Sequence, residues 1–243
     1  MKSWKRVIKW VILLGYFPII LSFVTVSQRA TICSDIQVVV KDSMEMRFIS
    51  KQEIRTMLLN NYPKLLGYEI NKFDFDEIES FVENHHTINK CEVFNTKNGV
   101  LHIQVEQHKP ILRVFTDRET FYLERDGYRI PVSKNFASNT LVVNGTIPSN
   151  YDDLLNVGRL INDDDFWKSQ IEQIYIRRNN EYILIPRVGD HWILLGKPID
   201  VDRKLSKLKA LYKNGLLPHE WNKYKLINLK YENQVICSKN RDI

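Results

Sequence analysis

VIKWVILLGYFPIILSFVTV, residues 7–26, is the stretch that sets the architecture of this chain. As an α-helix it would reach about 30 Å, the thickness of the hydrocarbon core of a bilayer. A positively charged flank on such a segment stays in the cytoplasm. We therefore predict a cytoplasmic tail at 1–6, a transmembrane helix at 7–26, a linker at 27–35 and an exported remainder. The basic residues at its start are Lys2, Lys5, Arg6 and Lys9.

Two other interpretations of this stretch are open: a cleaved signal peptide and a buried helix of a soluble domain. A cleaved signal needs a shorter apolar core and small residues at the cleavage site, which residues 27–30 do not supply. A lipoprotein signal needs small residues before its cysteine, whereas Thr31 and Ile32 precede Cys33. Pro18 is tolerated better in a membrane helix than in a soluble one. A retained anchor is the favoured interpretation.

The charge balance gives no reason to expect a nucleic-acid partner. The 243 residues include 35 Lys and Arg against 29 Asp and Glu, a formal net charge of +6. Four of these positive charges lie at the N-terminal segment, so the exported part carries a net charge of only about +2. That charge is too small to indicate a surface that binds nucleic acid. Cys33, Cys91 and Cys237 are too few for a disulfide scaffold, and either one bridge or three separate thiols is compatible with the sequence.

Residues 36–109 predict a compact β-α-α-β-β unit. Ser50 and Glu53 have the spacing of a capping box, and Asp74 repeats the start signal, so each opens a helix. Apolar and polar residues alternate over 100–106, as in a half-buried strand. The three predicted strands are 36–40, 88–95 and 100–106.

Residues 110–243 predict a strand-rich α+β domain with an antiparallel sheet, so the whole chain has an α+β fold. Helices are expected to begin at Ser149 or Asn150, at 163–165, and at Asp200 or Asp202. The last strand, 226–237, would place Leu229 and Tyr231 on one face as the C-terminal edge strand. The other expected strands lie at 111–116, 121–124, 128–131, 141–143, 171–177, 181–186 and 192–195.

The sequence offers no convincing metal site. His85, His86 and Cys91 are close together, but adjacent histidines on a helix diverge by about 100° and do not share one ion easily. His102 and His108 lack the paired spacing that zinc ligands favour. Packed or solvated histidines are the better interpretation, and no cofactor is expected.

Enzymatic devices are also missing from the sequence. The acidic run at 163–165 and the group of Asp74, Asp76, Glu77 and Glu79 both lie at predicted helix starts, where carboxylates cap amides. There is no G-x-S-x-G, no catalytic cysteine signature, and no glycine-rich phosphate loop. We therefore expect a protein that is not an enzyme and has no small-molecule substrate.

Four stretches match motifs of a known family: VEQHKPI at 105–111, FYLERDG at 121–127, LVVNG at 141–145 and INLKYENQV at 227–235. Together with the order of its parts, they make the chain resemble the FtsQ/DivIB family of bacterial division proteins. The first unit is similar to a POTRA (polypeptide-transport-associated) domain. The resemblance covers nearly the whole chain and departs from the family at Asn228 and Lys230, where Asp and Arg are usual; in composition it is closer to Bacteroidetes-type members.

The resemblance implies a divisome scaffold of the inner membrane that helps regulate septal peptidoglycan synthesis. Its periplasmic part would bind FtsB- and FtsL-like single-span proteins, and other divisome members, by accepting a strand at the end of its sheet. An alternative is a POTRA-containing accessory protein of transport or outer-membrane assembly. The residues expected to bind the partner are Leu229, Lys230, Tyr231, Glu232, Asn233, Gln234, Val235 and Ile236.

Overall fold

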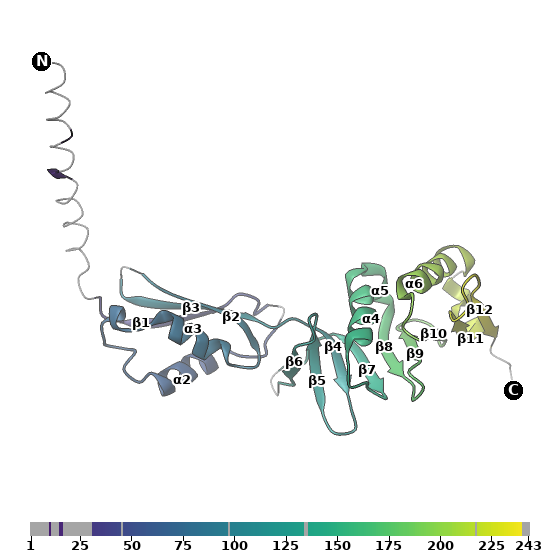
Figure 1. Ribbon diagram of the computed structural model, residues 1–243, viewed down its shortest axis with the longest axis horizontal. Helices are drawn as coiled ribbons and strands as arrows, with labels where there is room; N and C mark the ends of the chain where they lie inside the picture. The colour runs from purple at the N-terminus through teal and green to yellow at the C-terminus, as the bar shows by residue number, and fades with distance from the viewer. Residues whose placement is uncertain are drawn as a thin grey trace, which may run out of the picture. The chain divides into compact units, whose positions relative to one another are not determined.

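The computed structural model describes residues 10, 15–16, 31–44, 46–96, 98–133, 136–216 and 218–239, which form two compact units (Figure 1). The described residues of Met1–Asp42 belong with Ser50–Glu106 in unit 1. Unit 2 combines Ser43–Ile49 with Gln107–Ile243. The chain thus passes between the units three times, and the segment Ser43–Ile49 departs from the domain boundaries predicted above.

The predicted transmembrane helix falls almost wholly outside the described residues. Only Trp10, Gly15 and Tyr16 of residues 7–26 are described. No helix within the described ranges is both long enough and apolar enough to span a bilayer.

Unit 1 has the predicted β-α-α-β-β order, which is confirmed. Its strands form a three-stranded sheet in the order β1-β3-β2, with β1 parallel to the central β3. Ile36, Val38 and Val40 alternate with more exposed residues along β1 and turn into the core. The elements are β1 (Asp35–Val40), α2 (Lys51–Asn61), a 3₁₀ turn (Ile70–Lys72), α3 (Phe75–Glu83), β2 (Ile88–Asn95) and β3 (Val100–Gln107).

Both helices of unit 1 begin at the predicted caps. The Ser50 side chain accepts from the Glu53 N–H while the Glu53 carboxylate accepts from the Ser50 N–H, which completes the capping box. Asp74 accepts from the backbone of the first turn of α3. Each cap satisfies amides that the first helical turn leaves without partners.

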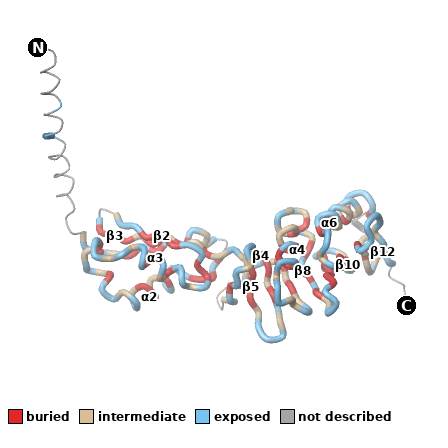
Figure 2. The backbone as a smooth tube through the Cα atoms, in the orientation of Figure 1, coloured by how far each residue is buried: buried red, intermediate tan, exposed pale blue. Residues whose placement is uncertain are grey.

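Unit 2 is built on a sheet that has nine strands in the described part of the chain, in the order β12-β11-β10-β9-β8-β7-β4-β5-β6. Helices α4, α5 and α6 lie over one face of it (Figure 1). The buried residues concentrate along the inner strands (Figure 2). The strands are β4 (Pro110–Phe115), β5 (Thr120–Glu124), β6 (Arg129–Pro131), β7 (Leu141–Gly145), β8 (Ile171–Ile176), β9 (Tyr182–Pro186), β10 (Trp192–Gly196), β11 (Tyr224–Asn228) and β12 (Ile236–Lys239). The helices are α4 (Asp152–Asp163), α5 (Asp165–Gln170) and α6 (Val201–Ala210), followed by a π-helical turn (Leu211–Gly215) and a 3₁₀ turn (Pro218–Lys223).

The prediction of an antiparallel sheet is wrong, because the sheet is mixed. β4 pairs in parallel with β7, β7 with β8, and β10 with β11. Helices α4 and α5 connect β7 to β8, and α6 lies in the connection from β10 to β11. A helical crossover of this length returns the chain in the same direction, so it joins parallel neighbours.

The segment Ser43–Ile49 covers one end of this sheet. Met46 and Phe48 pack in a buried cluster with Tyr122 and Ile130. The buried amide of Gln107 holds the segment from both sides: it donates to the Met46 carbonyl at 3.0 Å and accepts from the Ile49 N–H at 3.2 Å. A loop between β1 and α2 therefore belongs to the core of unit 2.

Candidate functional site

Strand β12 is the last strand of the large sheet. It pairs antiparallel with β11, with Ile227 opposite Cys237 and Asn228 opposite Ile236. β11 in turn lies parallel to β10. In the described part of the chain no strand pairs with the other side of β12. Such an edge presents backbone N–H and C=O groups that can pair with an added strand.

The predicted continuous strand over 226–237 is wrong. The structure divides it into β11, β12 and a loop at 229–235, so most of the predicted partner-binding residues lie in the loop and only Ile236 lies in a strand. The loop starts where Asn228 Oδ1 accepts from the Lys230 N–H at 3.0 Å. An asparagine side chain that bonds two residues ahead forms a turn of its own and competes with strand pairing.

Leu229 and Tyr231, which the alternation placed on one face, have opposite environments. Leu229 is fully buried in the main core of unit 2, and its N–H donates to the Leu194 carbonyl at 2.9 Å. Tyr231 is 48% exposed. The alternation with a period of two therefore ends at Leu229, and the Tyr231 side chain lies at the surface rather than in the core.

Helix α6 holds the loop through its basic side chains. Lys207 Nζ donates to the carbonyls of Tyr231 at 2.5 Å and Glu232 at 3.0 Å. Arg203 donates to Asn233 Oδ1 at 3.2 Å. These bonds are exposed to solvent, so each contributes little stability, but together they fix the path of the loop beside β12.

The side chain of Lys230 extends out of the loop to the buried carboxylate of Glu181. Its Nζ lies 2.6 Å from Glu181 Oε1, and Arg177 Nη1 lies 3.6 Å from Glu181 Oε2. Glu181 is only 9% exposed, and the hydrogen bond from Lys230 lowers the pKa of its carboxyl against the opposing effect of burial. The Lys230 stem passes close over Gly196, where an added Cβ would lie 2.7 Å from Lys230 Cγ.

A pocket of about 380 Å³ lies between the loop and α6. Burial lowers the pKa of the Lys204 ammonium in its wall. The exposed side chain of Ile199 and the Tyr231 ring both border it, so it offers apolar contacts within a basic rim. Its cations are Lys197, Arg203, Lys204, Lys207 and Lys230, and its carboxylates are Glu181, Asp200 and Glu232.

The histidines and acidic runs that the sequence drew attention to have structural contacts. His85 Nδ1 lies 2.9 Å from Thr87 Oγ1, and the His102 ring stacks on Phe94. No group of three or more metal-binding side chains forms within the residues that the structure describes. In the acidic runs, Asp164 caps α5 as predicted, whereas Glu79 bonds to strand β2 and not to the start of its own helix.

The three cysteines form no disulfide in the structure. Cys33 and Cys91 are buried in unit 1, whereas Cys237 is partly buried on β12 in unit 2. Burial is the main cause that raises the pKa of the Cys91 thiol to about 12, so this thiol stays protonated at neutral pH.

Residues 31–106 match the model of the POTRA-like domain, which defines unit 1 as a module of that class. The family model described as FtsQ/DivIB, C-terminal related, matches residues 109–238, more than half of the chain. The chain belongs to the FtsQ/DivIB family of division proteins, a family of scaffolds and not of enzymes. A search of curated proteins gives no match.

Proposed function

We propose that this chain is a single-pass scaffold of the bacterial divisome. In this proposal residues 7–26 anchor it in the inner membrane, residues 1–6 lie in the cytoplasm, and both units lie in the periplasm at the division septum. Family membership and the apolar N-terminal stretch support this arrangement. The scaffold would link early and late division proteins and help regulate septal peptidoglycan synthesis.

The proposed binding site for FtsB- and FtsL-like single-span partners is the edge of β12. The observation that carries the proposal is that the segment matching the FtsQ/DivIB model ends in a strand whose outer side pairs with no strand among the described residues. A partner strand would add there through backbone hydrogen bonds. The predicted site residues then supply side chains next to the added strand, and Ile236 also supplies part of the backbone edge.

Backbone pairing alone is too weak to hold a partner at β12. The strand is four residues long, and each backbone hydrogen bond contributes about 0.5–1.5 kcal/mol net. Association costs at least about 4 kcal/mol in lost translational and rotational freedom. Side-chain anchors must supply the rest, and the exposed Tyr231 and Ile199 beside the pocket are suited to that role.

Site-specific photo-crosslinking combined with co-purification tests the proposal. A photoreactive residue is placed at Ser238, which is exposed on β12, and in a matched control at Val132, which is exposed beside β6 at the opposite end of the sheet. The full chain is purified in detergent with FtsB- and FtsL-like proteins. We expect both partners to co-purify and a crosslink from Ser238 but not from Val132.

Two results would contradict the proposal. Equal crosslinking from Ser238 and Val132 would exclude β12 as the site while leaving the scaffold function in place. Recovery of outer-membrane assembly proteins in place of single-span division proteins would favour the transport alternative.

A further inference from the structure

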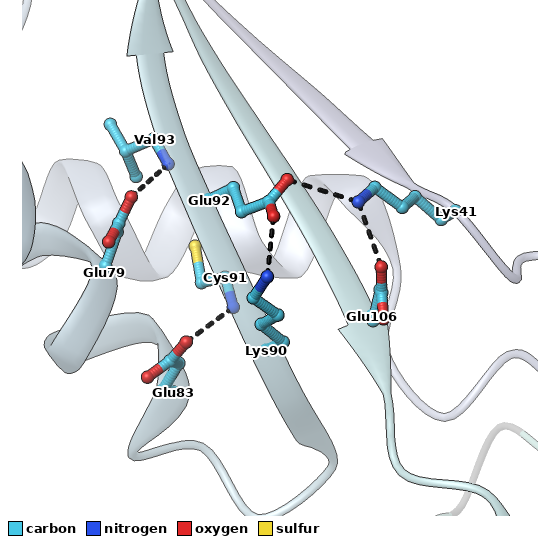
Figure 3. Close-up of polar contacts among 8 residues, drawn as sticks. All are labelled: Lys41, Glu79, Glu83, Lys90, Cys91, Glu92, Val93 and Glu106. Carbon is cyan, nitrogen blue, oxygen red and sulfur yellow. Dashed lines mark hydrogen bonds and ion pairs between the residues drawn. The ribbon is translucent and has the colours of Figure 1, made fainter.

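The outer strand of the unit 1 sheet is covered by carboxylates of its own helix. Strand β2 ends the order β1-β3-β2, so one side of it has no neighbouring strand among the described residues. On that side Glu79 Oε1 accepts from the Val93 N–H at 2.6 Å, and Glu83 Oε1 accepts from the Cys91 N–H at 2.8 Å (Figure 3). Two amides that an incoming strand would need are therefore already bonded.

The spacing of helix and strand explains why both bonds form. Residues 79 and 83 are one helical turn apart, a rise of about 6 Å. Residues 91 and 93 are two strand positions apart, about 6.6–6.8 Å, and turn their amides to the same side. Ile78 and Val82 are buried beneath α3, which places the residue after each of them on the flank that faces β2.

At the opposite edge of this sheet, strand β1 is bonded by an arginine rather than by carboxylates. Arg55 of α2 donates to the Ile36 carbonyl of β1 and lies 3.1 Å from Asp35 Oδ1. Each end strand of unit 1 thus has backbone groups bonded to a helix side chain: a carbonyl of β1 accepts from an arginine, and two amides of β2 donate to glutamates. This is how an edge is kept from pairing with other chains.

The two ends of the large sheet differ from this arrangement and from each other. β6 is three residues long and ends in Pro131, which has no N–H to offer. Within the described residues, no hydrogen bond joins a side chain to the backbone of β12. Among the described residues, helix side chains therefore bond backbone groups on both end strands of unit 1 but none on β12.

We propose that Glu79 and Glu83 keep the β2 edge closed to strand addition, so that an incoming strand is directed to β12. The first half concerns unit 1 alone, and the second half rests on the proposed function. To bind at β2, a strand must displace two charge-assisted hydrogen bonds that also satisfy the carboxylates. Removing both carboxylates should open the edge without changing β12.

A labelled peptide with the sequence of β3, VLHIQVEQ, is the probe, because this sequence already pairs with β2 on its other side. The full chain is compared with the double variant Glu79→Ala, Glu83→Ala. The matched control is Glu79→Gln, Glu83→Gln, whose amide oxygens still accept hydrogen bonds. Binding is followed by fluorescence anisotropy and located by hydrogen exchange of β2.

We expect the alanine variant to bind the peptide at β2 at least about tenfold more tightly than the wild type, with the glutamine variant close to the wild type. Equal binding of all three at β2 would overturn the proposal. Binding of a division partner at β12 is measured in parallel, so failure of the proposed function is seen separately.

A second measurement keeps the proposal testable if the alanine variant does not fold. In the wild type the amides of Cys91 and Val93 should exchange as slowly as those of the central strand β3. Exchange of both at the rate of open-edge amides would show that the carboxylates do not close β2. Glu83→Ala alone, at the exposed end of α3, is the milder variant and should accelerate exchange at Cys91 while leaving Val93 protected.

Discussion

Two single variants, Leu229→Ala and Tyr231→Ala, test whether residues 229–235 form a loop or part of one continuous strand. Leu229 is fully buried in the unit 2 core, so its truncation leaves a cavity and should lower the free energy of unfolding by about 3 kcal/mol. Tyr231 is about half exposed and has no place in that core, so Tyr231→Ala should change stability by no more than about 0.5 kcal/mol.

Tryptophan fluorescence during thermal unfolding measures the difference. Three of the five tryptophans, Trp167, Trp192 and Trp221, lie in unit 2, and residues 31–106 contain none. Trp4 and Trp10 precede the folded part of unit 1, so the change in signal on unfolding reports mainly unit 2. For a unit of this size about 3 kcal/mol corresponds to a midpoint lower by about 9 °C. Equal losses in the two variants would mean that both side chains face the core, and the loop assignment would then be wrong.

Three further predictions concern the same region and the thiols. Gly196 has φ of +75° beneath the Lys230 stem, so Gly196→Ala should cost about 1–2 kcal/mol in urea unfolding, and a neutral effect would contradict the close contact. The pKa of Glu181 is lowered in the folded state, so its contribution to stability is present above its unfolded pKa of about 4.3 and is lost as the pH falls through the folded value. The stability difference between wild type and Glu181→Gln should therefore shrink between pH 7 and about pH 3, and a constant difference would refute this origin. With a thiol reagent at pH 8, Cys237 should react before Cys91 in the folded protein, and mass spectrometry of peptides would show the reverse order if the burial is wrong.

The sequence predicted unit 1 well because its signals are local. The capping box at Ser50 and Glu53, the Asp74 cap and the alternation along β3 each act within a few residues. The hydrogen bond from Val93 to Glu79 was not predicted, because a carboxylate near the start of a helix is already explained by the helix dipole. Its partner Val93 lies on a later strand, far along the sequence. Only the packing of α3 against β2 brings the two together.

In unit 2 the sequence located most elements but not their pairing. Parallel pairing of β7 with β8 depends on where the crossover helices pack, which the order of elements does not state. The C-terminal error had a different cause: Ile227, Leu229 and Tyr231 alternate as a strand should, but the Asn228 side chain starts a turn that ends the pattern. The strand that ends the sheet among the described residues is β12 (Ile236–Lys239), and not the predicted 229–236.

The segment Ser43–Ile49 lies between two parts of unit 1 in the sequence but belongs to unit 2 in the fold. A chain begun at Lys109, where the FtsQ/DivIB match starts, would lack Met46 and Phe48, and Tyr122 and Ile130 would meet water. A fragment that starts at that boundary should therefore expose an apolar patch and tend to aggregate. A fragment that keeps this cluster must therefore contain Ser43–Ile49 together with residues 107–243, and the shortest continuous stretch that does so also includes most of unit 1.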